Sequence, residues 1–282
     1  MLPPLLEYAH ATLLQQHWYM NHILPEHVIR IVWCLILMCI YALVELDYLP
    51  GKQWKIRKDL HTSSHEIAYY IKASFINMVK WHIFPLLIYE ILFHRPNQYV
   101  YDAPTWFTLL WKPIGYTMIF DICTHMFHHI THLHPHIASF FHRAHATHHA
   151  SCGRYIYPWN GFYASGLECF AGLVFFLGAM IPLQMDPITR LVSIIFIHFV
   201  ATNIHSGYDF PWMFHNWSGI GRFAWHGSTG HYFHHQFGRK NLSTFWTFLD
   251  RWFNTYYDPS GHPLAHSREF IYQRSEFIIE QK

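Results

Sequence analysis

Hydrophobic residues gather in five long stretches, separated by shorter polar segments. The stretches lie at about residues 28–46, 73–93, 104–124, 161–182 and 188–206. Each is close to the ~20 residues that a helix needs to cross the hydrocarbon core of a bilayer. Five such stretches in 282 residues exceed what the core of a soluble protein needs, so the pattern predicts an all-α integral membrane protein.

The number of membrane-spanning helices depends on the second stretch. The stretch 73–93 includes Lys80, His82 and Glu90. These polar residues make it the weakest of the five candidates for a membrane-spanning helix. We therefore expect four to five transmembrane helices. In the four-helix version, 73–93 lies in the membrane interface.

Composition supports a membrane protein and narrows the range of partners. Hydrophobic residues make up 52% of the chain and charged residues 13%, about half the usual share of roughly 25%. The net charge is only +2, which argues against a nucleic-acid partner. No internal repeat or low-complexity linker is visible, so residues 1–282 are expected to form a single domain.

The distribution of Lys and Arg predicts the orientation. Residues 1–29 contain none, whereas 47–72 contain five and the region after residue 206 contains seven. The positive-inside rule then places the N-terminus outside and the C-terminus in the cytosol. The last two stretches form a hairpin, so the chain returns near His205 to the side it left near His149. We expect a helical cap there, on the cytosolic face of the endoplasmic reticulum if the protein is eukaryotic or of the inner membrane if it is bacterial.

The chain has 27 histidines, and three clusters of them have regular spacing. The clusters are His128-His129-Ile-Thr-His132, His145-Ala-Thr-His148-His149 and His231-Tyr-Phe-His234-His235. On a helix, positions i, i+3 and i+4 share one face, so each cluster can direct its imidazoles at one point. Neutral imidazole suits iron, zinc, copper and nickel. The clusters predict a site for two metal ions.

Spacing alone does not select the ligands in the histidine-rich run. His125-Met-Phe-His128-His129 is a further match to the same pattern. His129, His134 and His136 also remain open as ligands. His226, five residues before the third cluster, is a further candidate.

The order of these clusters resembles the fatty acid hydroxylase/sterol desaturase superfamily of membrane di-iron enzymes. Members typically have an Asp seven residues before the first box histidine, as Asp121 stands before His128. Two positions depart from the family pattern. His129 replaces an Arg in the first box, and Ala146 replaces a basic residue in the second.

Two further runs resemble the 4-methylsterol oxidase branch. They are His205-Ser-Gly-Tyr-Asp-Phe-Pro-Trp212 and Thr247-Phe-Leu-Asp250-Arg-Trp-Phe-Asn-Thr255, with Asn254 in place of a usual Gly. The resemblance covers about residues 115–258, and the first hundred residues match only in having apolar spans.

Carried over by position, the resemblance implies nine iron ligands. They are His128, His132, His145, His148, His149, His205, His231, His234 and His235. It also implies roles for Glu168 and Asp121. A carboxylate inside a span is costly and often functional, and Glu168 could accept a hydrogen bond from a ligand imidazole or relay protons in catalysis. Asp121 and Asp250 could orient imidazoles in the same way, and Asp209 either does so or caps a turn.

The expected activity is O2-dependent hydroxylation or desaturation of a membrane lipid by two iron ions, with zinc able to replace iron. A sterol or sterol-like substrate is favoured, and a fatty acyl substrate is the alternative. The sequence has no flavin or nicotinamide motif, so a separate cytochrome and reductase must supply electrons. Two rival classes are a histidine-rich metal transporter and a haem electron carrier that uses His82 and His198.

Overall fold

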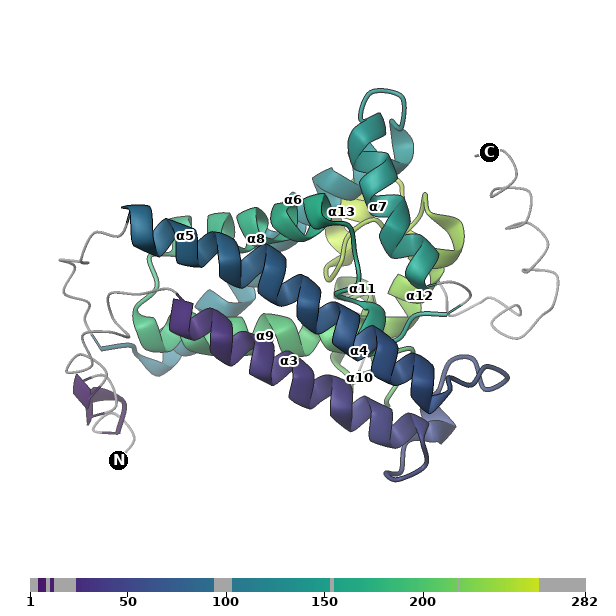
Figure 1. The fold of residues 1–282 in the computed structure, drawn as a ribbon, viewed down its shortest axis with the longest axis horizontal. Coiled ribbons are helices and arrows are strands. Elements are labelled where there is room, and N and C mark those ends of the chain that lie inside the picture. Colours follow the sequence, from purple (N-terminus) through teal and green to yellow (C-terminus); the bar gives the residue numbers. More distant parts are fainter. Residues whose placement is uncertain are drawn as a thin grey trace.

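The structure, a computed structural model, describes residues 5–8, 11–12, 24–93, 103–152, 155–217 and 219–258. Within these ranges the regular elements are helices, accompanied by two isolated β-bridges. The long helices lie side by side, and shorter helices gather at one end of them, on the right of Figure 1. The all-α prediction is confirmed.

Four helices are long and apolar enough to cross a membrane. The first is α3 (Leu24–Glu45). The second is continuous through α4 (Ser64–Met78), a π-helical turn η2 (Val79–Ile83) and α5 (Phe84–Phe93). The third is α8 (Gly166–Met180) with η4 (Ile181–Leu183), and the fourth is α9 (Pro187–Ile204).

The four candidates are not the four that the sequence favoured. The stretch 73–93, expected to be the weakest, belongs to one of them. The stretch 104–124 lies in α6 (Trp106–Leu133), which is not among them. α6 continues into the first histidine cluster, so this 28-residue helix connects the bundle to the predicted metal site.

The hairpin that brings distant histidines together has a clear local cause. Asp186 caps α9 by accepting the backbone N–H groups of Ile188 and Thr189, each at 3.0 Å. Pro187 occupies the first helical position, where a missing N–H has no cost. α8 and α9 therefore run in opposite directions, as the sequence predicts, and His205 ends α9 at the same end of the bundle as the start of α8.

Five further α-helices form the helical cap at that end. They are α7 (Ser139–Cys152), α10 (Phe214–Trp217), α11 (Gly219–Ala224), α12 (Gly227–Phe237) and α13 (Thr247–Trp252). α7 packs on α6 and α8, and α12 packs on α9. The histidine clusters lie on these helices and on the adjoining end of α6.

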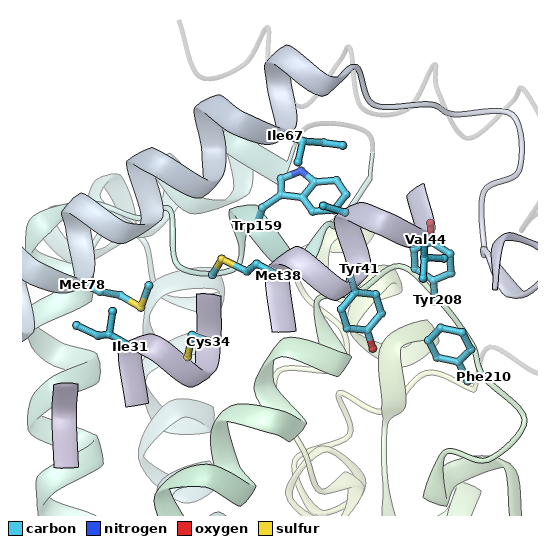
Figure 2. Close-up of a cluster of buried hydrophobic side chains, with 11 residues drawn as sticks. Ile31, Cys34, Met38, Tyr41, Val44, Ile67, Met78, Trp159, Tyr208 and Phe210 are labelled. Atoms are coloured by element: carbon cyan, nitrogen blue, oxygen red, sulfur yellow. The ribbon is translucent and has the colours of Figure 1, made fainter. Parts of the chain in front are cut away.

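A buried apolar cluster joins the cap end to the bundle. It contains Met38 and Tyr41 from α3 together with Trp159, Tyr208 and Phe210 from segments that border the cap. Figure 2 shows these side chains packed between α3 and the loops beside it. Burial of large aromatic and aliphatic side chains, at ~25 cal/mol per Å² of apolar surface, holds the loops against the end of the bundle.

A buried ion pair lies beside this cluster. Lys55 Nζ is 2.7 Å from Glu45 Oε1, and both side chains are 1% exposed. Tyr208 donates its hydroxyl to the other Glu45 oxygen at 2.6 Å. The carboxylate of Glu45 thus links the end of α3 to two loops of the cap end.

Removal of Lys55 should therefore destabilise the fold. We expect Lys55→Met to lower the free energy of unfolding by about 3 kcal/mol, because it leaves the Glu45 carboxylate buried without its cation. Lys52 pairs with Asp47 at a solvent-exposed position (side chains 30% and 69% exposed). As the matched control, Lys52→Met should cost less than ~1 kcal/mol. Denaturant unfolding in mild detergent measures both, and equal losses would contradict the assignment.

Candidate metal centre

Eight histidines form two groups of four, and in each group the candidate ligand nitrogens lie within 4.8 Å of one another. The first group is His132, His145, His149 and His234; the second group is His148, His205, His231 and His235. All eight were predicted as ligands from the sequence. Two nitrogens on opposite sides of one ion are ~4.2 Å apart when each bond is ~2.1 Å. The 4.8 Å limit of each group exceeds this span by about 0.6 Å, so each group is close in size to a single-ion site.

The groups share their helices. α7 contributes His145 and His149 to the first group and His148 to the second. α12 likewise contributes to both. The rings of His149 and His235, one from each group, are 4.4 Å apart between centroids. Positions i, i+3 and i+4 on two facing helices thus place the two groups side by side.

The Nε2 atoms within the groups approach one another closely. The separation is 2.9 Å between His145 and His149, 2.9 Å between His205 and His231, and 3.0 Å between His231 and His235. The Nε2 atoms of His132 and His234 are buried without a hydrogen-bond partner. A cluster of ring nitrogens that face each other is what a shared cation would satisfy.

The opposite ring nitrogens determine which tautomer is present. His145 Nδ1 donates to Glu168 at 2.7 Å, as expected for that carboxylate. His234 Nδ1 donates to the Lys240 carbonyl at 3.1 Å, and His205 Nδ1 to the Ala201 carbonyl at 3.2 Å. When Nδ1 carries the proton, Nε2 keeps its lone pair and can bind a metal.

Burial keeps these imidazoles neutral. It lowers the pKa of all eight below the usual value of 6.5, to about 4 for His148 and His205. Neighbouring imidazoles lower most of these pKa values further. Neutral ligands with free lone pairs at pH 7 suit Fe, Zn, Cu or Ni, so the residues fit two such ions.

His128, the ninth predicted ligand, lies beside the first group but is not a member of it. Its Nδ1 donates to the Leu242 carbonyl at 2.7 Å. Its ring centroid is 4.8 Å from that of His145 and 4.9 Å from that of His234. His128 also lines the cavity next to the second group. Its role as a ligand stays a prediction.

The other histidines considered as ligands lie outside both groups. His125 Nδ1 is 2.9 Å from the Ser243 hydroxyl, and His226 Nε2 donates to Asp250 at 2.8 Å. His129 packs against Phe253. His134 and His136 are exposed, beyond the last residue of α6.

Asp121 and Asp250 act on the loop that follows α12. Asp121 accepts the backbone N–H groups of residues 244–246 at 2.6–3.1 Å. Asp250 accepts those of residues 242 and 243 at 2.7 and 2.9 Å. The same loop supplies the Leu242 carbonyl to His128. The donors to Asp121 are thus backbone N–H groups and the Thr124 hydroxyl, and its influence on an imidazole is indirect, whereas Asp250 also contacts His226 directly.

The hydrogen bonds of Asp250 also lower the pKa of its carboxyl group. Burial alone would raise the pKa of this carboxyl, but the hydrogen bonds from His226, Thr255 and the backbone outweigh burial and hold the pKa below its usual range. Asp209 accepts a hydrogen bond from His215 at 2.7 Å. His215 belongs to neither group, so Asp209 positions a neighbouring loop.

Arg30 is a residue of the site region that the sequence analysis passed over. It lies in the first apolar stretch and is 1% exposed, in the wall of a cavity that reaches the second group. A charge within a predicted span is a signal of function, and this one was available in the sequence. His82 and His198, considered as haem ligands, line the same cavity.

Comparisons with known proteins agree with this geometry. The fatty acid hydroxylase family model matches residues 113–255, which include all eight grouped histidines and Glu168. A cholesterol 25-hydroxylase-like protein 2 from Danio rerio is 26% identical over 228 residues, which cover 79% of this chain and 78% of the relative. Human cholesterol 25-hydroxylase is 23% identical over 207 residues, which cover 73% and 72%.

The comparisons bear on the family more than on the branch. No solved structure matches the chain significantly. The superfamily resemblance and the enzyme class are confirmed. The resemblance to the 4-methylsterol oxidase branch stays a prediction, because the relatives reported above are named cholesterol 25-hydroxylases or cholesterol 25-hydroxylase-like proteins. With a family match over half of its length and its membrane-spanning helices, this chain is an oxidoreductase that belongs to the fatty acid hydroxylase family.

Proposed function

We propose that this protein hydroxylates a membrane lipid, a sterol or a sterol-like molecule, at a two-iron centre held by the two histidine groups. One observation carries the proposal. The two groups lie side by side, and His148, His205 and His231 of the second group border a cavity inside the membrane-spanning bundle. A lipid in that cavity would place a C–H bond next to the metal site.

A two-iron centre would supply, with O2, an oxidant able to break an unactivated C–H bond. The chain's own residues hold and orient this centre and exclude water from it. The Nδ1 donations of His145 to Glu168 and of His205 and His234 to backbone carbonyls fix the direction of the Nε2 lone pair in these three residues. Burial of the histidines keeps the site dry, which protects a reactive centre from side reactions.

The choice among lipid substrates rests on the relatives and on the sequence. Hydroxylation is favoured over desaturation, since the family and the relatives are named hydroxylases. The relatives' names support a sterol substrate, as does the run from His205 to Trp212. A fatty acyl substrate is the alternative within the same family.

Electrons must reach the site from another protein. Within this proposal a separate cytochrome and reductase supply them, because the sequence contains no flavin or nicotinamide motif. The cap end carries the positively charged segment 52–58 and the turn 184–186 lies at the opposite end. The positive-inside rule places the cap, and the docking of an electron donor, on the cytosolic face.

The metal content tests the two-ion centre. Protein purified after growth with ample iron should contain about two metal ions per chain, one for each histidine group. His234→Ala in the first group and His231→Ala in the second should each lower this to about one or fewer, because a buried ligand is lost. His136→Ala, at an exposed position, is the control and should keep the wild-type content. Elemental analysis of the four proteins is the measurement, and a wild-type content of one ion or none contradicts the proposal.

Turnover tests the lipid hydroxylase activity. Cells that express the wild-type protein should accumulate a lipid with one added oxygen, and growth under 18O2 should raise its mass by a further two units. His148→Ala should reduce the product by more than ~100-fold, because loss of a ligand should exceed the 10–100-fold effect of changes around a ligand. His134→Ala should retain most activity. Mass spectrometry of extracted lipids gives the result, and incorporation of oxygen from water alone would be incompatible with an oxygenase.

Labelling in sealed vesicles tests the orientation. A cysteine at His61, in the exposed loop before α4, should react from the cytosolic side. A cysteine at Gln184, in the exposed turn between α8 and α9, should react only from the opposite side. Both substitutions belong in a background with Cys39→Ser, because Cys39 is exposed. The reverse pattern would place the metal site on the other face.

A further inference from the structure

A cavity of about 190 Å³ lies inside the bundle, between the histidine groups and a second set of polar side chains. One end is bordered by Glu168 and by histidines of the metal-site region. The other end contains Arg30 from α3, His82 from the π-helical turn η2 and His198 from α9. Much of the wall between the ends is apolar, with Met78, Phe120, Phe162, Phe176 and Ile197.

Helix geometry gives the distance between the two ends. His198 precedes His205 by two turns of α9, and at 1.5 Å per residue this separation is ~10 Å. On α8, Phe176 follows Glu168 by eight residues, or ~12 Å. The ring of Phe176 contacts both Arg30 and His198. The centroid of this ring is 5.4 Å from Arg30 Cζ and 4.9 Å from the centroid of the His198 ring. The polar end is therefore about 10–12 Å from the histidine end.

Arg30 has no carboxylate to balance its charge among the residues that the structure describes. Its Nε and Nη2 atoms are buried without a hydrogen-bond partner. Glu26, one turn earlier on α3, pairs with Arg190 at 2.6–2.8 Å instead. An unpaired guanidinium inside a membrane bundle is costly and is most often retained for function.

The two histidines at this end add hydrogen-bonding atoms. His82 Nδ1 is buried without a partner, and it lies in a π-helical turn, a feature frequently found at functional sites. His198 Nδ1 donates to the Ile194 carbonyl at 2.9 Å, which leaves Nε2 as the atom open to a ligand. Three side chains from three helices thus converge on one end of the cavity.

We propose that Arg30, together with His82 and His198, binds the oxygen-bearing polar head of the lipid substrate. This inference rests on the proposed function, because it assigns the polar end of the cavity to the lipid that the histidine end oxidises. The head is a hydrogen-bond acceptor, either a carboxylate or a hydroxyl. The oxidised carbon lies about 10–12 Å from it, the separation that the helix rise sets between the two ends.

Binding of matched lipid pairs tests the proposal. The probes are cholesterol with 5α-cholestane, which lacks the hydroxyl, and palmitic acid with its methyl ester. Native mass spectrometry of the zinc-loaded protein in detergent measures binding without turnover. Wild-type protein should bind the polar member of one pair at least ~10-fold more tightly, the effect of one hydrogen bond to a charged group. The pair that discriminates identifies the head as a hydroxyl or a carboxylate.

Variants of Arg30 separate a binding role from a structural one. Arg30→Gln should bind both members of the pair about equally, and Arg30→Lys should restore part of the preference because it keeps the charge. The metal content of Arg30→Gln should stay at the wild-type value. Its thermal stability without lipid should be unchanged or higher, since an unpaired buried charge is removed. A loss of stability with an unchanged lipid preference would overturn the proposal.

Two glycines of α8 provide a matched pair for the cavity itself. A Cβ at Gly172 or at Gly178 would meet no heavy atom within 4 Å. Gly172 lines the cavity, whereas Gly178 is exposed on another face of the helix. Gly172→Leu should weaken binding of the polar lipid on the order of 10-fold by filling the cavity, and Gly178→Leu should not. Equal effects of the two changes would show that the lipid binds elsewhere.

The two proposals fail in different ways. Lipid binding that depends on Arg30, in an iron-loaded protein that oxidises no lipid, would uphold the head-group site and overturn the proposed function. Lipid oxidation at the wild-type rate and KM in Arg30→Gln would uphold the function and overturn the head-group site. A wild-type protein without preference in either lipid pair also overturns the head-group site.

Discussion

The convergence of uncharged imidazole lone pairs is the constraint on which the rest of the structure depends. Nitrogens that face each other at about 3 Å, such as Nε2 of His231 and His235, have no favourable arrangement in a dry interior unless they share a cation or a proton. Three other rings of the two groups are oriented through their opposite nitrogen, since Nδ1 of His145 donates to Glu168 and Nδ1 of His205 and of His234 donates to a backbone carbonyl. The cap helices, the α9 terminus and the loop after α12 must therefore all keep their places for two ions to be bound.

Several buried polar interactions fix the positions of the cap helices and loops. Asp121 and Asp250 hold the loop 242–246 through its backbone N–H groups. Gly227, at the start of α12, has φ +63°, and a Cβ there would lie 2.3 Å from the His215 ring that Asp209 holds. Such interactions add modest net stability when they are complete and cost much more when they are broken. Their contribution here is to define one arrangement of the cap on the bundle.

The bundle itself contributes more than a membrane anchor. Its helices enclose a cavity with a histidine-lined end and a second polar end, and the helices α8 and α9 determine the separation of the two. A lipid that fills this cavity would be aligned by its head and oxidised at a carbon selected by distance. The charge of Arg30 is an unfavourable feature of the ligand-free fold, which is the usual relation between stability and function at a binding site.

The sequence by itself determined the features that depend on residues near one another in the chain. Apolar stretches of about 20 residues predicted the membrane-spanning helices, and the i, i+3, i+4 spacing predicted that each histidine cluster faces one point, because both are properties of a single helix. Only the tertiary structure decided which histidines of the run 125–149 meet those of α12, and that His128 lies beside the first group. It also decided that α6 packs along α8 and α9, and that Arg30 has no carboxylate partner among the residues that the structure describes. These outcomes depend on which side chains lie opposite across the bundle, and spacing along the chain contains no information about that.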